Sequence, residues 1–213
     1  NINVFATSSI DYVNNSNLVE EAIDMVQYSR ADSVYICTTP DYRMYTPDAS
    51  NSLDIIYSQE AVDNLDNTGI DSNYTATYYP WILTRDTVNN TQIYLPPTGE
   101  VCRNLALTDN ISFPWFASAG YTRGLVNSIK ARVKLTQEDR DTLYQGRINP
   151  IATFADVGTV IWGNKTLQVA DSALNRLNVR RLLLQARKLI SAVAVRLLFE
   201  QNDQIVRQQF LDS

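Results

Sequence analysis

The N-terminal forty residues constrain the fold most, because a strand, a helix and a second strand follow one another there. Short β-branched and aromatic runs occur at Ile2–Ala6 and Ser33–Thr38. Between them an Asn/Ser-rich turn leads to Asn17, a predicted N-cap with Glu20 three residues later, and a helix is expected over about 17–29. The apolar residues at helical spacing are Leu18, Ala22, Met25 and Val26. A strand–helix–strand unit with a right-handed crossover requires a parallel sheet that is covered on at least one face.

Further strand and helix patterns fill the rest of the chain. Residues 40–75 are polar and irregular, with a hint of helix at Ile55–Leu65, and are expected to run over the surface. The expected strands are Tyr74–Tyr79, a hairpin of Trp81–Thr84 with Gln92–Leu95, and a hairpin of Ile151–Phe154 with Thr159–Trp162. The expected helices run from Pro96-Pro97 to about Leu107, from the capping box of Thr136 and Asp139 to about Tyr144, over Leu174–Phe199, and from Asp203. The predicted class is α/β with α+β character, a mixed and partly parallel sheet flanked by helices and followed by a long, basic, amphipathic C-terminal helix.

Catalysis and metal binding lack the residues they need. The chain has no histidine, which excludes histidine-activated nucleophiles, histidine general bases and histidine metal sites. The two cysteines, Cys37 and Cys102, are too few for a structural zinc site, and Cys37 lies in an apolar run typical of a buried thiol. Dinucleotide and P-loop motifs are missing, and Gly120–Gly124, which has no lysine, is interpreted as a structural turn rather than a phosphate loop. We therefore expect no enzyme, no catalytic residue, no cofactor and no metal.

Composition narrows the range of partners. A net charge of −5 and a pI near 4.7 argue against a domain that binds nucleic acid. No apolar run reaches the length that a bilayer requires, so no membrane insertion is expected. The 213 residues are enough for one sizeable domain with its own core.

The last long helix has an unusual charge pattern. Between Ser172 and Phe199 there is no acid, and the bases are Arg176, Arg180, Arg181, Arg187, Lys188 and Arg196. At helical spacing most of these bases are predicted on one arc, opposite an apolar core face. That predicted core face consists of Val179, Leu182, Ala186, Leu189, Ile190 and Val193. Two interpretations stay open: a solvated face that favours the C-terminal end of the helix dipole, or an electrostatic docking face for an acidic partner.

The run from Leu95 to Gly124 uses proline, glycine and tryptophan freely, which is typical of a segment whose shape is specified. It contains Pro-Pro-Thr-Gly at 96–99, Thr-Asp-Asn at 108–110, Pro-Trp at 114–115 and Ser-Ala-Gly at 118–120. Three later segments follow: Leu143-Tyr144 with Ile148-Asn149-Pro150-Ile151, Val160-Ile161-Trp162-Gly163 with Lys165-Thr166-Leu167, and Asn178-Val179-Arg180-Arg181-Leu182 with Phe199-Glu200-Gln201-Asn202. In this order and spacing, over about 90–210, the chain resembles the C-terminal half of contractile tail sheath proteins of phages and related injection machines.

The resemblance implies a set of structural signature residues and some departures. The signature residues are Pro96, Pro97, Gly99, Asp109, Pro114, Trp115, Gly120, Asn149, Trp162 and Gly163. Ser118, Gln201 and the pair Cys102-Arg103 differ from the family pattern. These departures favour a divergent member, of the T-even kind or from another large phage.

By the same resemblance, the parent protein is a structural subunit of a contractile tail sheath. It polymerises as a helical stack of sixfold rings around the tail tube and contracts to drive the tube through the host envelope. The implied partners are other copies of the subunit, the tail tube protein, the baseplate and the sheath terminator, and the implied location is the phage tail of the virion, assembled in the host cytoplasm. Alternatives are the sheath of a type VI or pyocin-like injection system and a non-catalytic α/β binding module.

The resemblance also gives the charged helix a role and the chain a place in a longer protein. Arg180, Arg181, Arg187 and Lys188 are the candidate docking face toward the tube or a neighbour, although the two adjacent arginines fit internal salt bridges equally well. The chain is expected to be one α/β core domain over 1–213, a fragment that stays monomeric when isolated. Within it we expect a βαβ unit at 1–40, the irregular excursion at 40–75, the signature region at 76–213 and, from 203, the start of a connection to a missing C-terminal segment.

Overall fold

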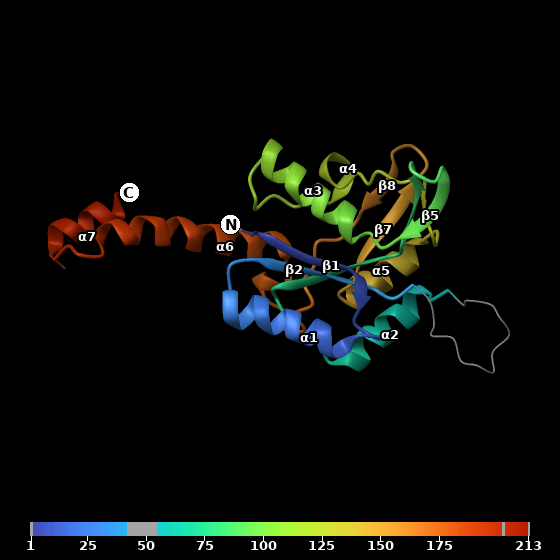
Figure 1. The fold of residues 1–213 in the computed structure, drawn as a ribbon, viewed down its shortest axis with the longest axis horizontal. Coiled ribbons are helices and arrows are strands. Elements are labelled where there is room, and N and C mark those ends of the chain that lie inside the picture. The colour runs from blue at the N-terminus through green and yellow to red at the C-terminus, as the bar shows by residue number, and fades with distance from the viewer. Residues whose placement is uncertain (1, 42–54, 202, 213) are drawn as a thin grey trace.

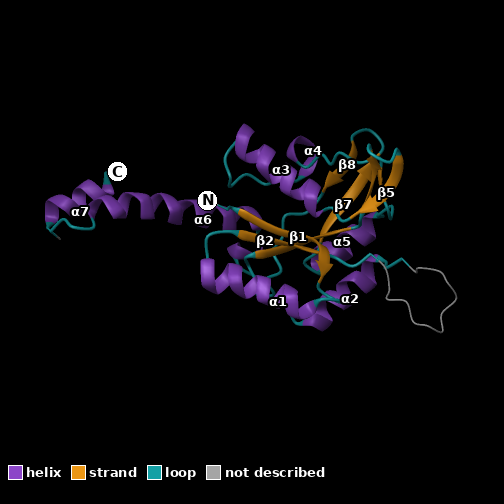
Figure 2. Cartoon of the chain, viewed as in Figure 1, coloured by secondary structure: helices purple, strands orange, loops and turns teal. Residues whose placement is uncertain are grey.

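A central sheet with helices on both faces forms the body of the protein, and a long helix projects from it (Figures 1 and 2). The structure is a computed structural model, and it describes residues 2–41, 55–201 and 203–212. The projecting helix carries the C-terminal end of the chain away from the body (Figure 1). The predicted α/β class with a partly parallel sheet and a long C-terminal helix is confirmed.

The central sheet has five strands in the order β1-β2-β3-β7-β8. These strands are β1 (Val4–Asp11), β2 (Val34–Thr38), β3 (Thr75–Tyr79), β7 (Asn149–Phe154) and β8 (Gly158–Ile161). The first four are parallel and β8 returns antiparallel to β7. Every residue of β2 and β3 is buried, which explains why both read as continuous apolar or β-branched runs instead of alternating ones.

Alternation along β2 divides the core into two layers, one on each face of the sheet. Tyr35 and Cys37 point to a layer that is covered by α1 (Ser16–Asp24), α2 (Ser58–Thr68) and α5 (Gln137–Gln145). Val34 and Ile36 point to the opposite layer, which contains residues of α3 (Thr98–Ile111) and α6 (Leu177–Ala194). Because successive side chains of a strand point to opposite faces, one strand supplies both layers.

A small antiparallel sheet lies beside the main one, in the order β5-β4-β6. The predicted hairpin is confirmed as β4 (Ile82–Asp86) with β5 (Thr91–Leu95), and β6 (Lys130–Ala131) pairs with the other edge of β4. The second predicted hairpin is confirmed as β7 and β8.

The prediction that 40–75 runs over the surface is wrong for its second half. Residues 42–54 lie outside the described residues. From Ser58 the chain forms α2, in which Ala61 and Leu65 are fully buried against the core layer under α5. The hint of helix at Ile55–Leu65 is thus confirmed in part as α2. Its exposed polar residues, Gln59, Asp63, Asp66 and Asn67, lower the average hydropathy of the segment and obscured its buried face.

The N-terminal strand and helix also begin and end differently from the prediction. β1 continues through the Ser/Asp residues to Asp11, held to β2 by the bond that Thr38 Oγ1 donates to Thr7 O at 2.6 Å. The predicted cap at Asn17 is wrong, because the N-cap is Asn15 and it makes no side-chain cap bond. Beyond Asp24 the helix continues as a π-helical segment, Met25–Arg30.

The turn chemistry of the other helices agrees better with the sequence. The capping box of Thr136 and Asp139 is confirmed at the start of α5. Pro97 is the N-cap residue of α3, whose first residue is Thr98, and α3 extends past the predicted end at Leu107 to Ile111. The glycine-bounded segment is a single helical turn, α4 (Gly120–Arg123), which begins with Gly120 at φ +82°, a backbone conformation that suits glycine.

The long C-terminal helix is interrupted, and its faces differ from the predicted ones. A 3₁₀ turn (Ala173–Asn175) precedes α6, another (Val195–Leu197) follows it, and α7 (Gln204–Leu211) is the expected short helix. The buried residues of α6 are Leu177, Arg180, Arg181 and Leu184. Leu182, Leu189 and Ile190, predicted to face the core, are exposed. The predicted arrangement of a core face opposite a basic face is therefore wrong.

An internal ion pair fixes the first half of α6 to α3. Arg181 is 5% exposed and its Nη2 donates to both carboxylate oxygens of Asp109, at 2.6 and 2.7 Å. Arg180 is 8% exposed, lies over the ring of Tyr74 at 4.0 Å and donates to the side-chain oxygen of Asn73. The structure thus gives the adjacent arginines the internal role that the sequence left open.

We expect the substitution Asp109→Ala to lower the free energy of unfolding by about 3 kcal/mol, because it leaves the Arg181 guanidinium buried without its counter-ion. Urea denaturation of the chain measures the loss. The matched control is Asp32→Ala, which removes the exposed ion pair with Arg30 and should cost about 1 kcal/mol or less. Equal losses in the two variants would contradict the assigned role of the buried pair.

Asp41 should give the chain a pH-dependent stability. Burial raises its pKa to about 6, partly offset by Arg132, whose Nε lies 3.2 Å from the carboxylate. The unfolded chain releases this proton near pH 4. Between about pH 4 and pH 6 the folded state therefore holds more protons, and the contribution of this group to the free energy of unfolding falls as pH rises. Denaturation at several pH values should show this slope reduced in Asp41→Asn, and an unchanged slope would refute the assignment.

Candidate functional site

Two of the four candidate docking residues do not form a surface. Arg180 and Arg181 are buried against α3 and the start of β3, as described above, so a docking face that includes them is a wrong prediction of the sequence. The other two, Arg187 and Lys188, lie where α6 leaves the body. Whether they dock a partner stays a prediction.

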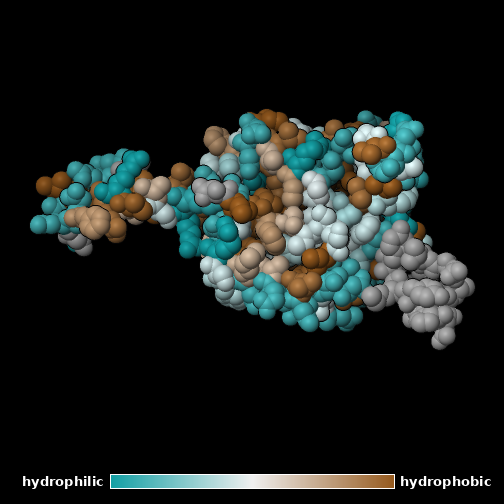
Figure 3. Space-filling model, in the orientation of Figure 1, coloured by the Kyte–Doolittle hydropathy of each residue, from teal (hydrophilic) through white to brown (hydrophobic). Residues whose placement is uncertain are grey.

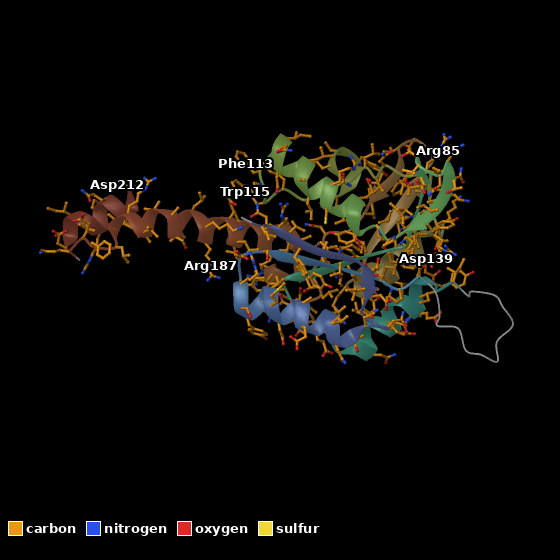
Figure 4. The ribbon with its side chains drawn as sticks, in the orientation of Figure 1. Arg85, Phe113, Trp115, Asp139, Arg187 and Asp212 are labelled. Carbon is orange, nitrogen blue, oxygen red and sulfur yellow. The ribbon has the colours of Figure 1, made fainter. Side chains whose placement is uncertain are left out.

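Arg187 and Lys188 tie the helix to the N-terminal part of the sheet. Arg187 Nη1 donates to the carbonyl oxygen of Ala31 at 2.9 Å, and Lys188 donates to the side-chain oxygen of Asn3. The bidentate Arg30 guanidinium holds the pKa of Asp32 below its usual value, and Lys188 adds a smaller effect in the same direction. Arg187 remains exposed and points away from the helix (Figure 4). These contacts leave the positive charges near solvent at the point where the helix separates from the body.

Past this point the helix exposes apolar side chains. We call the segment Leu189–Leu211 the arm; its placed residues include Phe199, which is 97% exposed. Figure 3 shows apolar residues among polar ones along this projecting segment. The other large exposed apolar residues of the arm are Leu189, Ile190, Val195, Leu198, Ile205, Phe210 and Leu211. A large exposed apolar surface marks an interaction site, and the helical pattern missed it by assuming that an apolar face lies in the core of its own chain.

Two signature residues, Trp162 and Gly163, line one hollow on the body, which we call the motif pocket. It has a volume of about 290 Å³, and its lining consists of Ala119, Arg140, Asp141, Tyr144, Pro150, Trp162, Gly163, Asn164 and Arg176. Three of the four sequence segments that carry the family resemblance contribute to it. The pairing of β7 with β8 and the return of the chain into α6 bring these segments together.

Asn149 lies buried next to two lining residues of the motif pocket, Pro150 and Gly163. It is fully buried; its Nδ2 donates to Thr77 O at 3.0 Å and to Lys165 O at 2.8 Å, and its Oδ1 accepts the N–H of Lys165 at 2.6 Å. Gly163 lies directly against it, because a Cβ at that position would be 2.7 Å from Asn149 Oδ1. Asn149 and Gly163 therefore join two strands and the following loop, a packing role that explains both as structural residues.

Aromatic and cationic side chains in and next to the lining of the motif pocket contact one another. The ring of Trp162 lies 5.0 Å from that of Tyr121 and 4.9 Å from that of Phe154. Around Tyr144, the Lys165 ammonium lies 4.3 Å from the ring centroid and Arg176 donates to the hydroxyl. Burial lowers the pKa of Lys165, and the nearby Arg176 adds to the effect.

The remaining signature residues shape the loop between α3 and α4. Trp115 stacks on Phe113 with ring centroids 4.7 Å apart (Figure 4), and its carbonyl accepts a bond from the Asn178 side chain at 3.4 Å. Pro114 lines a small hollow beside Arg181, while Gly99 is exposed at the start of α3 with free space where a Cβ would be. Pro96 and Pro97 directly precede α3. We therefore assign a structural role to these signature residues, which shape the start of α3 and the loop from α3 to α4.

Reactive groups are scarce in the described residues. Within 2–41, 55–201 and 203–212 there is no group of three or more histidine, cysteine or acidic side chains that could hold a metal ion. Cys37 is a buried free thiol, as predicted, and burial raises its pKa to about 12, which disfavours the nucleophilic thiolate. In the same part of the chain, no helix has both the length and the apolar content that crossing a bilayer takes.

Comparison with known proteins agrees with the motifs. No family model matches the chain. It is 34% identical over 210 residues to the tail sheath protein of Vibrio phage KVP40 and 29% identical over 201 residues to that of Enterobacteria phage T4, each match covering 92% of this chain. The chain spans 30% of the length of each of these two relatives.

Solved structures share the fold. The contracted helical sheath of the anti-feeding prophage superposes with a TM-score of 0.71 at 22% identity, over 98% of this chain and 51% of that one. The contracted sheath complex of an extracellular contractile injection system, PVC, gives a TM-score of 0.66 at 20% identity, over 96% of this chain and 50% of that one. The chain is thus related over most of its length to the contractile tail sheath proteins, as its motifs predict.

Proposed function

We propose that the protein is a structural subunit of a contractile phage tail sheath, which polymerises helically around the tail tube and contracts to drive the tube through the host envelope. The observation that carries this proposal is the identity to phage tail sheath proteins along nearly the whole chain. The shared fold with two contracted sheaths supports it independently. The partners are other copies in a helical stack of sixfold rings, the tube protein, the baseplate and the sheath terminator. The location is the phage tail, after assembly in the host cytoplasm.

The function that we propose involves no catalysis. The composition of the motif pocket supports a structural role. Its lining holds a single carboxylate, Asp141, whereas glycosidic and aspartic-protease acid chemistry needs a pair of carboxylates. No cofactor, nucleic acid or membrane enters the proposal.

A sheath of a non-phage injection system is the second candidate. It is favoured by the fold shared with the anti-feeding prophage and PVC sheaths. The phage assignment is preferred because identity to the phage proteins is 29–34% against 20–22% for those two sheaths.

Within this function, we propose that the arm, together with Arg187 and Lys188 at its base, docks on a partner protein. Arg187 and Lys188 place positive charge beside an exposed apolar helix, a combination that suits an acidic surface with apolar patches, such as the tube or a neighbouring subunit. A single exposed ion pair contributes about 0–1 kcal/mol, so repetition over many subunits supplies the net effect.

The full-length protein should form tubes or long empty sheath polymers when it is expressed alone, and negative-stain microscopy tests this. The isolated 213-residue chain should remain monomeric or associate weakly in analytical ultracentrifugation. A full-length protein that stays monomeric at every concentration tested would count against the sheath assignment.

The double substitution Arg187→Glu and Lys188→Glu should impair assembly of the full-length protein on the tube, because it reverses the charge at the base of the arm. The charge-preserving pair Arg187→Lys and Lys188→Arg is the control: it changes the bonds to Ala31 and Asn3 but keeps the charge, and extended tails should still form. Counting extended tails by microscopy measures the effect. A normal number of extended tails in the charge-reversed variant would contradict a docking role for Arg187 and Lys188.

A further inference from the structure

The lining of the motif pocket carries more positive than negative charge. Three cations surround it: Arg140 and Arg176 in the lining, and Lys165 on the ring of Tyr144. The acid in its lining is Asp141. Burial lowers the pKa of Lys165, and Arg176 and Arg147 add to the effect while Asp171 opposes it. A hollow with this excess charge suits a carboxylate.

The cations are held in place by contacts that leave charge available. Arg140 lies over the ring of Phe154 at 5.4 Å and donates one bond, at 3.4 Å, to the carbonyl oxygen of Leu135. Arg176 donates to the Tyr144 hydroxyl. A neutral carbonyl, a phenol and aromatic faces orient a guanidinium without cancelling its charge, so both arginines are preorganised for an anionic group.

Two lining residues of the motif pocket, Tyr144 and Trp162, are aromatic, which favours a ligand larger than a free ion. Trp162 is 38% and Tyr121 is 51% exposed, and they form one aromatic surface with Phe154. The volume of about 290 Å³ equals the space of roughly ten water molecules, enough for a side chain and its neighbour. A carboxylate beside an apolar residue fits these walls better than an isolated anion does.

The body carries a matching surface on α1. Its outer side exposes Glu20, Glu21 and Asp24, and among the placed parts of the chain no ion pair reaches any of the three. Leu18 and Met25 lie beside these acids, 57% and 36% exposed. This face combines carboxylates with apolar side chains, including a methionine that suits an aromatic wall.

We propose that the motif pocket of one subunit binds the acidic face of α1 on a second copy, with Arg140 and Arg176 against the carboxylates and Trp162 against Leu18 or Met25. This inference rests on the proposed sheath function and names one of its subunit contacts. The two surfaces are on different parts of the body, since α1 packs on β1 and β2 whereas the pocket lies beside α4, α5 and β7 (Figure 1). A contact between two different patches is heterologous, and it propagates into rings or filaments instead of closing a dimer.

The test is a charge exchange in the full-length protein. Arg140→Glu with Arg176→Glu, and separately Glu20→Lys with Glu21→Lys and Asp24→Lys, should each raise the concentration needed for sheath polymers about tenfold or more, because like charges then oppose each other. Mixing the two variants in equal amounts, or combining all five substitutions in one chain, restores opposite charges and should recover most of the polymer. Sedimentation and negative-stain microscopy measure polymer formation.

A matched control separates this contact from a general effect of charge. Arg85→Glu with Lys130→Glu reverses two exposed bases in the small sheet, neither of which lines the motif pocket, and should polymerise as the unchanged protein does. Circular dichroism melting confirms that each variant folds, and the α1 variants alter only exposed side chains. Unchanged polymerisation in the pocket variant, an equal loss in the control pair, or no recovery after the exchange would each overturn the proposal. Polymers of the unchanged protein would still stand as evidence for the sheath function.

Discussion

The buried amide of Asn149 joins the two halves of the chain. The parallel sheet continues from β3 to β7 through a short pairing, Tyr78 with Asn149 and Tyr79 with Pro150. Asn149 adds three side-chain bonds at this point, one to β3 and two to the loop after β8. An unsatisfied buried amide would cost several times what one of these bonds contributes, so the register of β7 and the course of the loop are set together. This loop contains Gly163 and Asn164 of the motif pocket and leads into α6, so it determines where both lie.

The C-terminal helix combines a fixed base with a free outer half. Its base is held by a buried ion pair, a cation–aromatic contact and Leu177 and Leu184 in the core. Its outer half exposes Leu189, Ile190 and Phe199. An exposed helix without packing is only marginally stable, because most helical stability in proteins comes from a buried face. The base therefore fixes the direction of the arm, and in the proposed sheath a partner surface would supply the burial that the arm lacks.

Local patterns predicted the elements, and long-range contacts decided the sites. The buried strands and the Thr136 capping box were readable because burial and capping act within a few residues. The role of Arg181 was not, since its partner Asp109 is 72 positions away and a charge pattern cannot tell a buried arginine from a solvated one. The motif pocket could not be predicted from the sequence for the same reason. Trp162 and Gly163 were recognisable as single residues, but the pairing of β7 with β8 is what brings them next to Pro150.

The contacts proposed between subunits differ in a way that suits a sheath. The arm offers mainly apolar area, whose stabilisation scales with the area buried and is not screened by ions as a charge pair is. The motif pocket offers charge on a preorganised aromatic wall, which gives orientation and specificity more than affinity. A polymer that rearranges on contraction requires subunit contacts that are individually weak but specific in orientation. A single strong contact per subunit would stabilise one of the two states so much that the other could not form. Ionic contacts of about 1 kcal/mol, repeated at every subunit, meet that requirement, and the apolar arm can keep neighbours attached while they change.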